Sequence, residues 1–198
     1  MKKWIAVSLA LFLLVGAVCV LPIHGEGEIY DNVIRLHVLA NSDSEQDQAL
    51  KLTVRDAVLA YTAPLLENVH DRATAEQILA AHTEQIDSLA EQTLRDAGSP
   101  APVRVTLSHE YYPRRSYEAI ALPAGEYLSL RVQIGSASGG NWWCVLFPPL
   151  CVTAASSAQS TCLAAGLSKE QYQMIAGTEQ TKYRVRFKLV EVFEQLFG

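Results

Sequence analysis

The hydrophobic and polar positions divide the chain into an apolar leader and a longer mixed segment. Lys2 and Lys3 precede residues 4–23, which contain no charged side chain. This pattern is typical of a signal peptide or a signal anchor, and about twenty apolar residues can span a bilayer if they are not removed. Whether the leader is cleaved stays open. Because lysines remain on the cytoplasmic side, we expect residues 1–25 to export residues 26–198 as one extracytoplasmic domain.

A strand and a long helix are expected at the start of the domain. Apolar side chains alternate over residues 32–39, which predicts a strand with one well-buried face. Ser42-x-x-Glu45 has the form of a capping box, so a helix should begin here. Apolar residues at helical spacing continue this helix to Leu66, and Pro64 is expected to strain its last turn.

A second helix is expected over residues 74–98. The pattern Thr74-x-x-Gln77 predicts its start, because a Thr side chain and a Gln side chain can cap each other's backbone. An apolar stripe follows at helical spacing, and Gly98 can adopt the left-handed conformation that ends a helix.

The middle of the chain is strand-like. Apolar and polar residues alternate over residues 103–109, and residues 117–122, 127–134 and 142–147 are three further strand-like runs. The second and third runs flank residues 123–126, where a proline followed by a glycine suits a tight turn, so these two runs should pair as a hairpin. Residues 135–141 are expected to form a flexible loop.

The C-terminal part is expected to be helical. Ser168-x-x-Gln171 is another capping box, and Gly177 is a suitable end for that helix. Residues 178–197 fit both a strand and a helix, and we favour the helix. The order of elements predicts an α+β fold, an antiparallel sheet packed with helices and preceded by one N-terminal hydrophobic export helix.

The charge of the chain limits the class of partner. The sequence holds 16 basic and 21 acidic residues, so the domain without Lys2 and Lys3 has 14 against 21, a net charge of −7. Nucleic acids need clustered Lys and Arg, so we expect no nucleic acid partner. The same balance argues against adhesion to anionic lipid, which leaves the leader, if uncleaved, as the membrane contact.

Two histidines raise the question of catalysis. His37 with Asp43, and His109 with Glu110, could do general acid–base work if their strands converged. The sequence offers no nucleophile elbow, metal-spaced histidine pair or paired-carboxylate motif beside them, so we expect a non-enzymatic protein without a cofactor. In that interpretation Asp43 caps a turn. Residues 135–140 could cradle a phosphate, but they lack the lysine and the following helix of a phosphate loop.

The cysteines of the domain have two interpretations. Cys144, Cys151 and Cys162 lie in the part expected outside the cytoplasm, where disulfides persist. Cys144 and Cys151 flank a Pro-Pro turn, so their spacing allows a bridge, with buried free thiols as the alternative; spacing alone does not fix the pairing. A zinc site would need a fourth ligand that the sequence does not supply, so no metal site is expected.

Aromatic and arginine residues are the best candidates for a partner-binding surface. A loop expected between two strands holds three tyrosines and two arginines: Tyr111, Tyr112, Arg114, Arg115 and Tyr117. These residue types dominate binding hot spots because they combine contact area with directional hydrogen bonds. Trp142 and Trp143 should point to opposite faces of a strand, one into the core and one outward. The alternative is a loop whose rings fold over the core.

Three stretches of the sequence stand out as motifs. The first is IRLHVLANSDS at residues 34–44, followed by DQALKL at 47–52 and VRDAV at 54–58. The second is LPAGEY at 122–127, and the third is GNWWCVLFPPLC at 140–151. In this order, behind an apolar leader, they resemble the stage II sporulation protein R family. The first and third stretches are specific, whereas the second alone would be weak.

The resemblance implies an exported signalling protein. A member of this family is made in the forespore, is secreted towards the mother cell, and triggers a membrane-embedded aspartic protease there. That protease cleaves the precursor of an early mother-cell sigma factor. The resemblance therefore implies this protease as the partner and an extracytoplasmic place in the forespore intermembrane space, secreted or membrane-anchored. The alternatives are an extracytoplasmic hydrolase acting on the cell envelope and a passive envelope protein.

Overall fold

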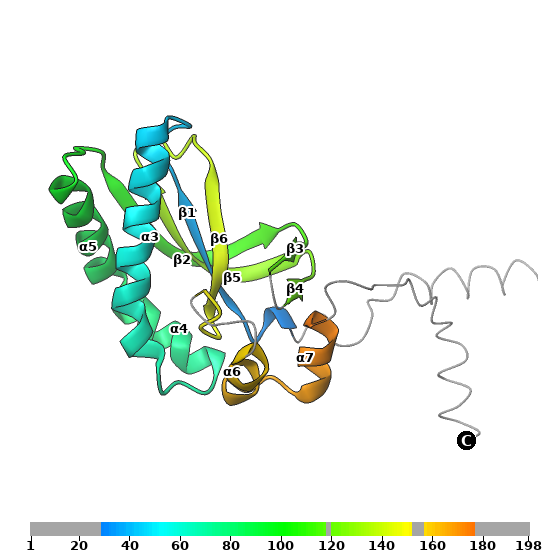
Figure 1. Ribbon diagram of the computed structural model, residues 1–198. Coiled ribbons are helices and arrows are strands. Elements are labelled where there is room, and N and C mark those ends of the chain that lie inside the picture. The colour runs from blue at the N-terminus through cyan, green and yellow to red at the C-terminus, as the bar shows by residue number, and fades with distance from the viewer. Residues whose placement is uncertain (1–28, 118–119, 152–156, 177–198) are drawn as a thin grey trace, which may run out of the picture. The chain divides into compact units, whose positions relative to one another are not determined.

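The computed structural model describes residues 29–117, 120–151 and 157–176, which belong to one compact unit (Figure 1). The expected export segment, the helix end at Gly177 and the helix expected over 178–197 lie outside the described residues. Within the described ranges, the helices lack the combination of length and hydropathy that crossing a membrane requires.

The central sheet has four strands in the order β2-β5-β1-β6 (Figure 1). Their bounds are Val103–Tyr112 for β2, Gly125–Ile134 for β5, Ile34–Leu39 for β1 and Asn141–Phe147 for β6. β5 runs antiparallel to β2, and β1 runs antiparallel to β6 but parallel to β5. The expected purely antiparallel sheet is therefore wrong, because the sheet is mixed. A parallel pair needs a long crossover connection, which the helices and β2 between β1 and β5 supply.

The hairpin expected between residues 117–122 and 127–134 is also wrong. β4, Ala121–Leu122, pairs instead with β3, Arg115–Ser116, in a separate two-stranded sheet. β5 pairs along its whole length with β2 and takes a central place between β2 and β1. Its four alternating apolar side chains, from Leu128 to Ile134, are all buried, and a two-residue partner could not have covered them.

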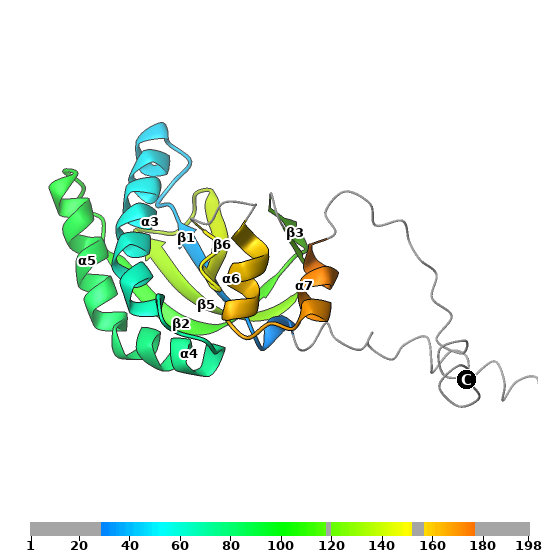
Figure 2. The ribbon, with the colours of Figure 1, turned by 60° about the horizontal axis from the view of Figure 1, so that its bottom comes forward.

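Three helices cover one face of the sheet (Figure 2). They are α3, Glu45–Leu66, α4, Arg72–Ala81, and α5, Thr83–Asp96. α3 ends at Leu66 as expected and contains Pro64 near its end. The second expected helix is two helices, because the backbone at His82 leaves the helical region with φ −106° and ψ 6°.

Side chains at the N-termini of the helices satisfy backbone N–H groups that have no partner within the helix. Ser44, rather than the expected Ser42, accepts from the backbone of Asp47 at the start of α3. Asp71, rather than the expected Thr74, caps α4. The capping box expected at residues 168–171 is confirmed at the start of α7, Lys169–Ile175.

Apolar side chains pack on both faces of the sheet. The larger core lies between the sheet and α3, α4 and α5, and it includes Leu36, Val38 and Val58. A second core, including Tyr127 and Val145, lies on the opposite face with residues of α6, Ala158–Ala164, and of α7. Residues of this second core occupy one end of that face. Polar side chains from the four strands occupy the other end.

Candidate functional site

The sheet face opposite α3, α4 and α5 presents polar side chains from all four strands. Alternation along each strand places them on one side, and the strand register aligns Thr106, Arg131, His37 and Trp143 in one row. We define the polar sheet face as ten residues: Arg104, Thr106, Ser108, Glu110, Ser129, Arg131, Gln133, His37, Asn141 and Trp143. Three of them, Arg104, Ser108 and Asn141, are exposed to solvent.

His37 is held by hydrogen bonds at both ring nitrogens. Its Nδ1 lies 2.9 Å from Glu110 Oε1, and its Nε2 lies 3.0 Å from Asn141 Oδ1. The sequence predicted two histidine–carboxylate pairs, but the structure brings together the histidine of one pair and the carboxylate of the other. His109 is exposed, and Asp43 lies in a loop. A ring with both nitrogens bonded in this way is oriented rather than free to take a proton from a substrate.

Glu110 is the centre of a wider polar network. Its Oε1 lies 3.5 Å from Arg131 Nε, and its Oε2 accepts a hydrogen bond of 3.0 Å from the hydroxyl of Tyr112. Burial raises the pKa of Glu110, but hydrogen bonds from His37, Tyr112 and Ser129 and the charge of His37 outweigh burial and lower this pKa to about 2. Glu110 is therefore a carboxylate across the physiological pH range.

Arg35 is a fully buried cation that sequence analysis missed. Its guanidinium lies 4.0 Å from the ring centroid of Tyr112 and 5.1 Å from that of Tyr127, and its Nη2 donates to the hydroxyl of Tyr117. Burial raises the pKa of both Tyr112 and Tyr117. Because these rings lie against the guanidinium, they stabilise Arg35 by cation–π contact. In the sequence, the one indication that this arginine is buried is its position between Ile34 and Leu36, two apolar residues of β1.

The aromatic–arginine loop divides between core and surface. Tyr112 is buried and Tyr117 is partly buried, so their rings do fold over the core as in the alternative interpretation. Tyr111 is 72% exposed and Arg114 is exposed, so these two remain available to a partner. Arg115 lies in β3 and stacks on a tryptophan of the polar sheet face. The partner-binding role of the loop stays a prediction.

The two tryptophans of β6 point to opposite faces, as expected for neighbouring residues of a strand. Trp143 lies on the polar sheet face, 5.4 Å from the ring of His37, with the Arg115 guanidinium 4.0 Å from its centroid. Trp142 faces α3, where the Arg55 guanidinium lies 4.2 Å away. Trp143 is partly buried and packs against the second core, whereas Trp142 is 36% exposed, so one ring faces the core and the other faces outward, as expected.

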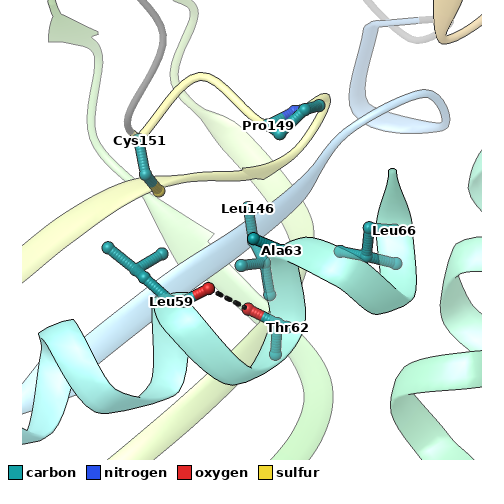
Figure 3. Close-up of a pocket in the computed structure, with 7 residues that line it drawn as sticks. All are labelled: Leu59, Thr62, Ala63, Leu66, Leu146, Pro149 and Cys151. Carbon is teal, nitrogen blue, oxygen red and sulfur yellow. Dashed lines mark hydrogen bonds between the residues drawn. The ribbon is translucent and has the colours of Figure 1, made fainter. Parts of the chain in front are cut away.

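A disulfide joins Cys144 of β6 to Cys151, with 5.5 Å between their Cα atoms. It closes the turn through Pro148 and Pro149 beside a small apolar pocket (Figure 3). The pocket is lined by Leu59, Thr62, Ala63, Leu66, Leu146, Pro149 and Cys151. The Thr62 hydroxyl already donates to the carbonyl oxygens of Val58 and Leu59, so the lining offers no free polar group to orient a ligand.

The end of the first motif, residues 41–43, is hydrogen-bonded to the loop of residues 135–140, which the sequence suggested as a possible phosphate site. Residues 135–140 are tied to residues 41–43: Gly140 N donates to Asp43 Oδ1 at 2.7 Å, and Ser136 N donates to Asn41 Oδ1 at 3.0 Å. The expected flexible loop is therefore a hydrogen-bonded one. These N–H groups already have acceptors, so they cannot hold a phosphate without breaking the pairing.

Two further kinds of chemistry, metal binding and nucleophilic attack by a thiol, have little support among the residues that the structure describes. No group of three or more His, Cys, Asp or Glu side chains could hold a metal ion among the residues that the structure describes. The buried thiol of Cys162 has its pKa raised by burial to about 11, so it is not a ready nucleophile.

Comparison with known proteins places these features in a family. The model of the family described as stage II sporulation protein R matches residues 30–157. Stage II sporulation protein R of Bacillus subtilis (strain 168) is 32% identical to this chain over 191 residues, which cover 92% of this chain and 82% of the relative. No solved structure matches the chain. The chain belongs to the stage II sporulation protein R family.

Proposed function

We propose that this protein is an exported sporulation signal that activates a membrane-embedded aspartic protease of the mother cell. The activated protease then cleaves the precursor of the early mother-cell sigma factor. Family membership over most of the chain is the observation that carries this proposal. The apolar leader at residues 4–23 supports export, because it follows two lysines in the manner of a signal peptide.

The geometry of the polar sheet face favours binding over catalysis. His37, the best candidate for a general base, has both ring nitrogens engaged, Nδ1 by the carboxylate of Glu110 and Nε2 by the side chain of Asn141. On the other face of β2, exposed Tyr111, with exposed Arg114 just beyond the strand, adds the residue types found in binding hot spots. A binding role without bond cleavage is therefore the simpler reading of this surface, and the envelope hydrolase is the weaker alternative.

A cell-based cleavage assay tests the proposal directly. The full chain is co-expressed with the membrane protease and the sigma-factor precursor of its own host in a bacterium that does not form spores. We expect cleaved sigma factor on an immunoblot when all three proteins are present, and none without this chain. An intact precursor beside a folded, exported chain would contradict the proposal.

Variants of the exposed loop locate the contact. Tyr111→Ala combined with Arg114→Ala should reduce cleavage at least fivefold, because hot-spot truncations cost about 1–2 kcal/mol or more. Gln92→Ala, on α5, is the matched exposed control and should leave cleavage unchanged. A His37→Gln variant separates the alternatives: an enzyme that uses this ring as its general base would lose its activity, whereas a binding protein that still folds would lose only part of its signal.

A further inference from the structure

Charge is distributed unevenly over the two sides of the sheet. Residues 43–96, which form the helical layer, hold eleven acidic and four basic side chains. The opposite side holds the arginines Arg104 and Arg131 of the polar sheet face and Arg115 stacked above it, with Glu110 as the carboxylate of that face. An acidic partner is therefore repelled by the helical layer and attracted to the polar sheet face.

The arginines of this side have donors to spare. Arg131 Nε and Arg115 Nε are buried and have no hydrogen-bond acceptor among the described residues. Glu110, 3.5 Å from Arg131 Nε, is already engaged by His37 and Tyr112. These two buried nitrogens are closed to an outside partner. A guanidinium has five N–H donors and pairs best with a carboxylate, however, and the outer nitrogens of exposed Arg104 and partly exposed Arg131 donate to no described residue, so they remain for acceptors supplied from outside.

The spacing of two arginines defines the shape of the partner. Thr106 lies opposite Arg131, and Arg104 lies opposite Gln133, so Arg104 and Arg131 are diagonal neighbours on adjacent strands. Diagonal neighbours on one face are about 7–8 Å apart. Alternate side chains of an extended peptide are separated by about 7 Å. Two carboxylates at alternate positions would thus reach both arginines together.

We propose that the polar sheet face binds an extended acidic polypeptide segment that carries carboxylates at alternate positions. Arg104 and Arg131 each bind one carboxylate, and the partly exposed ring of Trp143 contacts the aliphatic parts of the segment. This inference rests on the proposed function, since the segment would belong to the extracytoplasmic part of the membrane protease.

Peptide binding to the full chain, purified in detergent, tests the inference. The probe is a fluorescein-labelled peptide of alternating Glu and Thr, and its control has Gln in place of Glu. We expect anisotropy to report binding of the Glu peptide that weakens as salt increases, and at least tenfold weaker binding of the Gln peptide. Equal binding of the two peptides would overturn the inference.

Matched variants test the residues. Arg104→Gln with Arg131→Gln should weaken binding of the Glu peptide at least tenfold, whereas Arg95→Gln on the helical layer should leave it unchanged. Binding should alter tryptophan emission in Trp142→Phe, which keeps the ring of the polar sheet face, and much less in Trp143→Phe. An unchanged affinity in the double variant would refute the assignment. Equal competition by inorganic polyphosphate at the same charge concentration would also refute it, since the face would then bind any polyanion.

The same variants in the cleavage assay separate the two proposals. If the wild-type chain causes no cleavage but binds the Glu peptide through Arg104 and Arg131, the proposed function fails and the binding chemistry stands. If the wild-type chain causes cleavage and the double arginine variant causes as much, the proposed function stands and the inference fails.

Discussion

The guanidinium of Arg35 stacks on the ring of Tyr112, 4.0 Å from its centroid, and both side chains are withdrawn from solvent. Two of its nitrogens, Nε and Nη1, have no hydrogen-bond acceptor among the described residues. A buried charge held mainly by aromatic rings contributes less to stability than its packing does, because burial costs it its hydration. Charge and packing can therefore be separated by mutation.

We expect Arg35→Ala to lower the free energy of unfolding by about 3 kcal/mol, since it leaves a cavity and removes the donor to Tyr117. Arg35→Met fills most of the same volume without a charge, so we expect its unfolding free energy to stay within about 1 kcal/mol of the wild-type value. Chemical denaturation of the purified proteins measures both. A Met variant as unstable as the Ala variant would mean that the charge itself holds the tyrosines.

The carboxylate of Glu110 should make stability depend on acid pH. Its pKa is lowered to about 2 in the folded protein, so it contributes stability that is fully present above the ordinary value of 4.5 and is lost as the pH falls towards 2. We expect Glu110→Gln to lower the free energy of unfolding by about 1–3 kcal/mol at pH 7. The difference from wild type should shrink between pH 4.5 and pH 2, and a difference that stays constant over this range would contradict the expectation.

The pairing of loop 135–140 with residues 41–43 depends on a glycine, Gly139, that has no space for a side chain. A Cβ on Gly139 would overlap the backbone carbonyl of Ser42, whereas a Cβ on Gly140 would meet the flexible end of Gln48 at 3.1 Å and Asp43 Oδ1 at an ordinary contact distance of 3.5 Å. We expect Gly139→Ala to cost about 2–3 kcal/mol and Gly140→Ala less than about 1 kcal/mol. Melting temperatures of the two variants check this order, and equal losses would contradict it.

The disulfide should stabilise the end of β6. It closes a short loop, with a sequence separation of seven between Cys144 and Cys151. In the chain-entropy description, a loop of this size contributes about 2 kcal/mol by restricting the unfolded state. We expect the double variant Cys144→Ser and Cys151→Ser to lose about that much in denaturant titrations, and Cys162→Ser, with the disulfide intact, serves as the comparison.

The sequence predicted the elements whose signals are local. The helix ending at Leu66 was predicted from apolar spacing and Pro64, and the start of α7 from its capping box. The position of β5 between β2 and β1 was not predicted, because strand order depends on which segments bury their apolar side chains best against one another and not on the nearest turn. Because residues 117–122 and 127–134 are close in the sequence, they were expected to form a hairpin. The burial of the apolar side chains from Leu128 to Ile134 requires the longer strand β2 as the partner instead.

The candidate site could be predicted in its residue types but not in its pairings. His37 and Glu110 were both identified from the sequence, but they are 73 positions apart, and only the register of β2, β5 and β1 brings them together. Arg35 was not recognised, because arginine is rarely buried and only the fold brings the three tyrosines around it. Long-range contacts of this kind require the fold itself.

Because β1 lies between β5 and β6 in the sheet, the sheet can fold only after both of these later strands have been synthesised. Ile34–Leu39 is the first strand of the described residues, yet both of its neighbours are encoded far downstream, at Gly125–Ile134 and Asn141–Phe147. When β1 leaves the ribosome, neither neighbour has been synthesised, so the apolar side chains of β1 cannot yet be buried in the sheet. A nascent chain of this protein thus stays unfinished until its third motif is made, and a copy truncated before Asn141 would leave the central strand unpaired on one side.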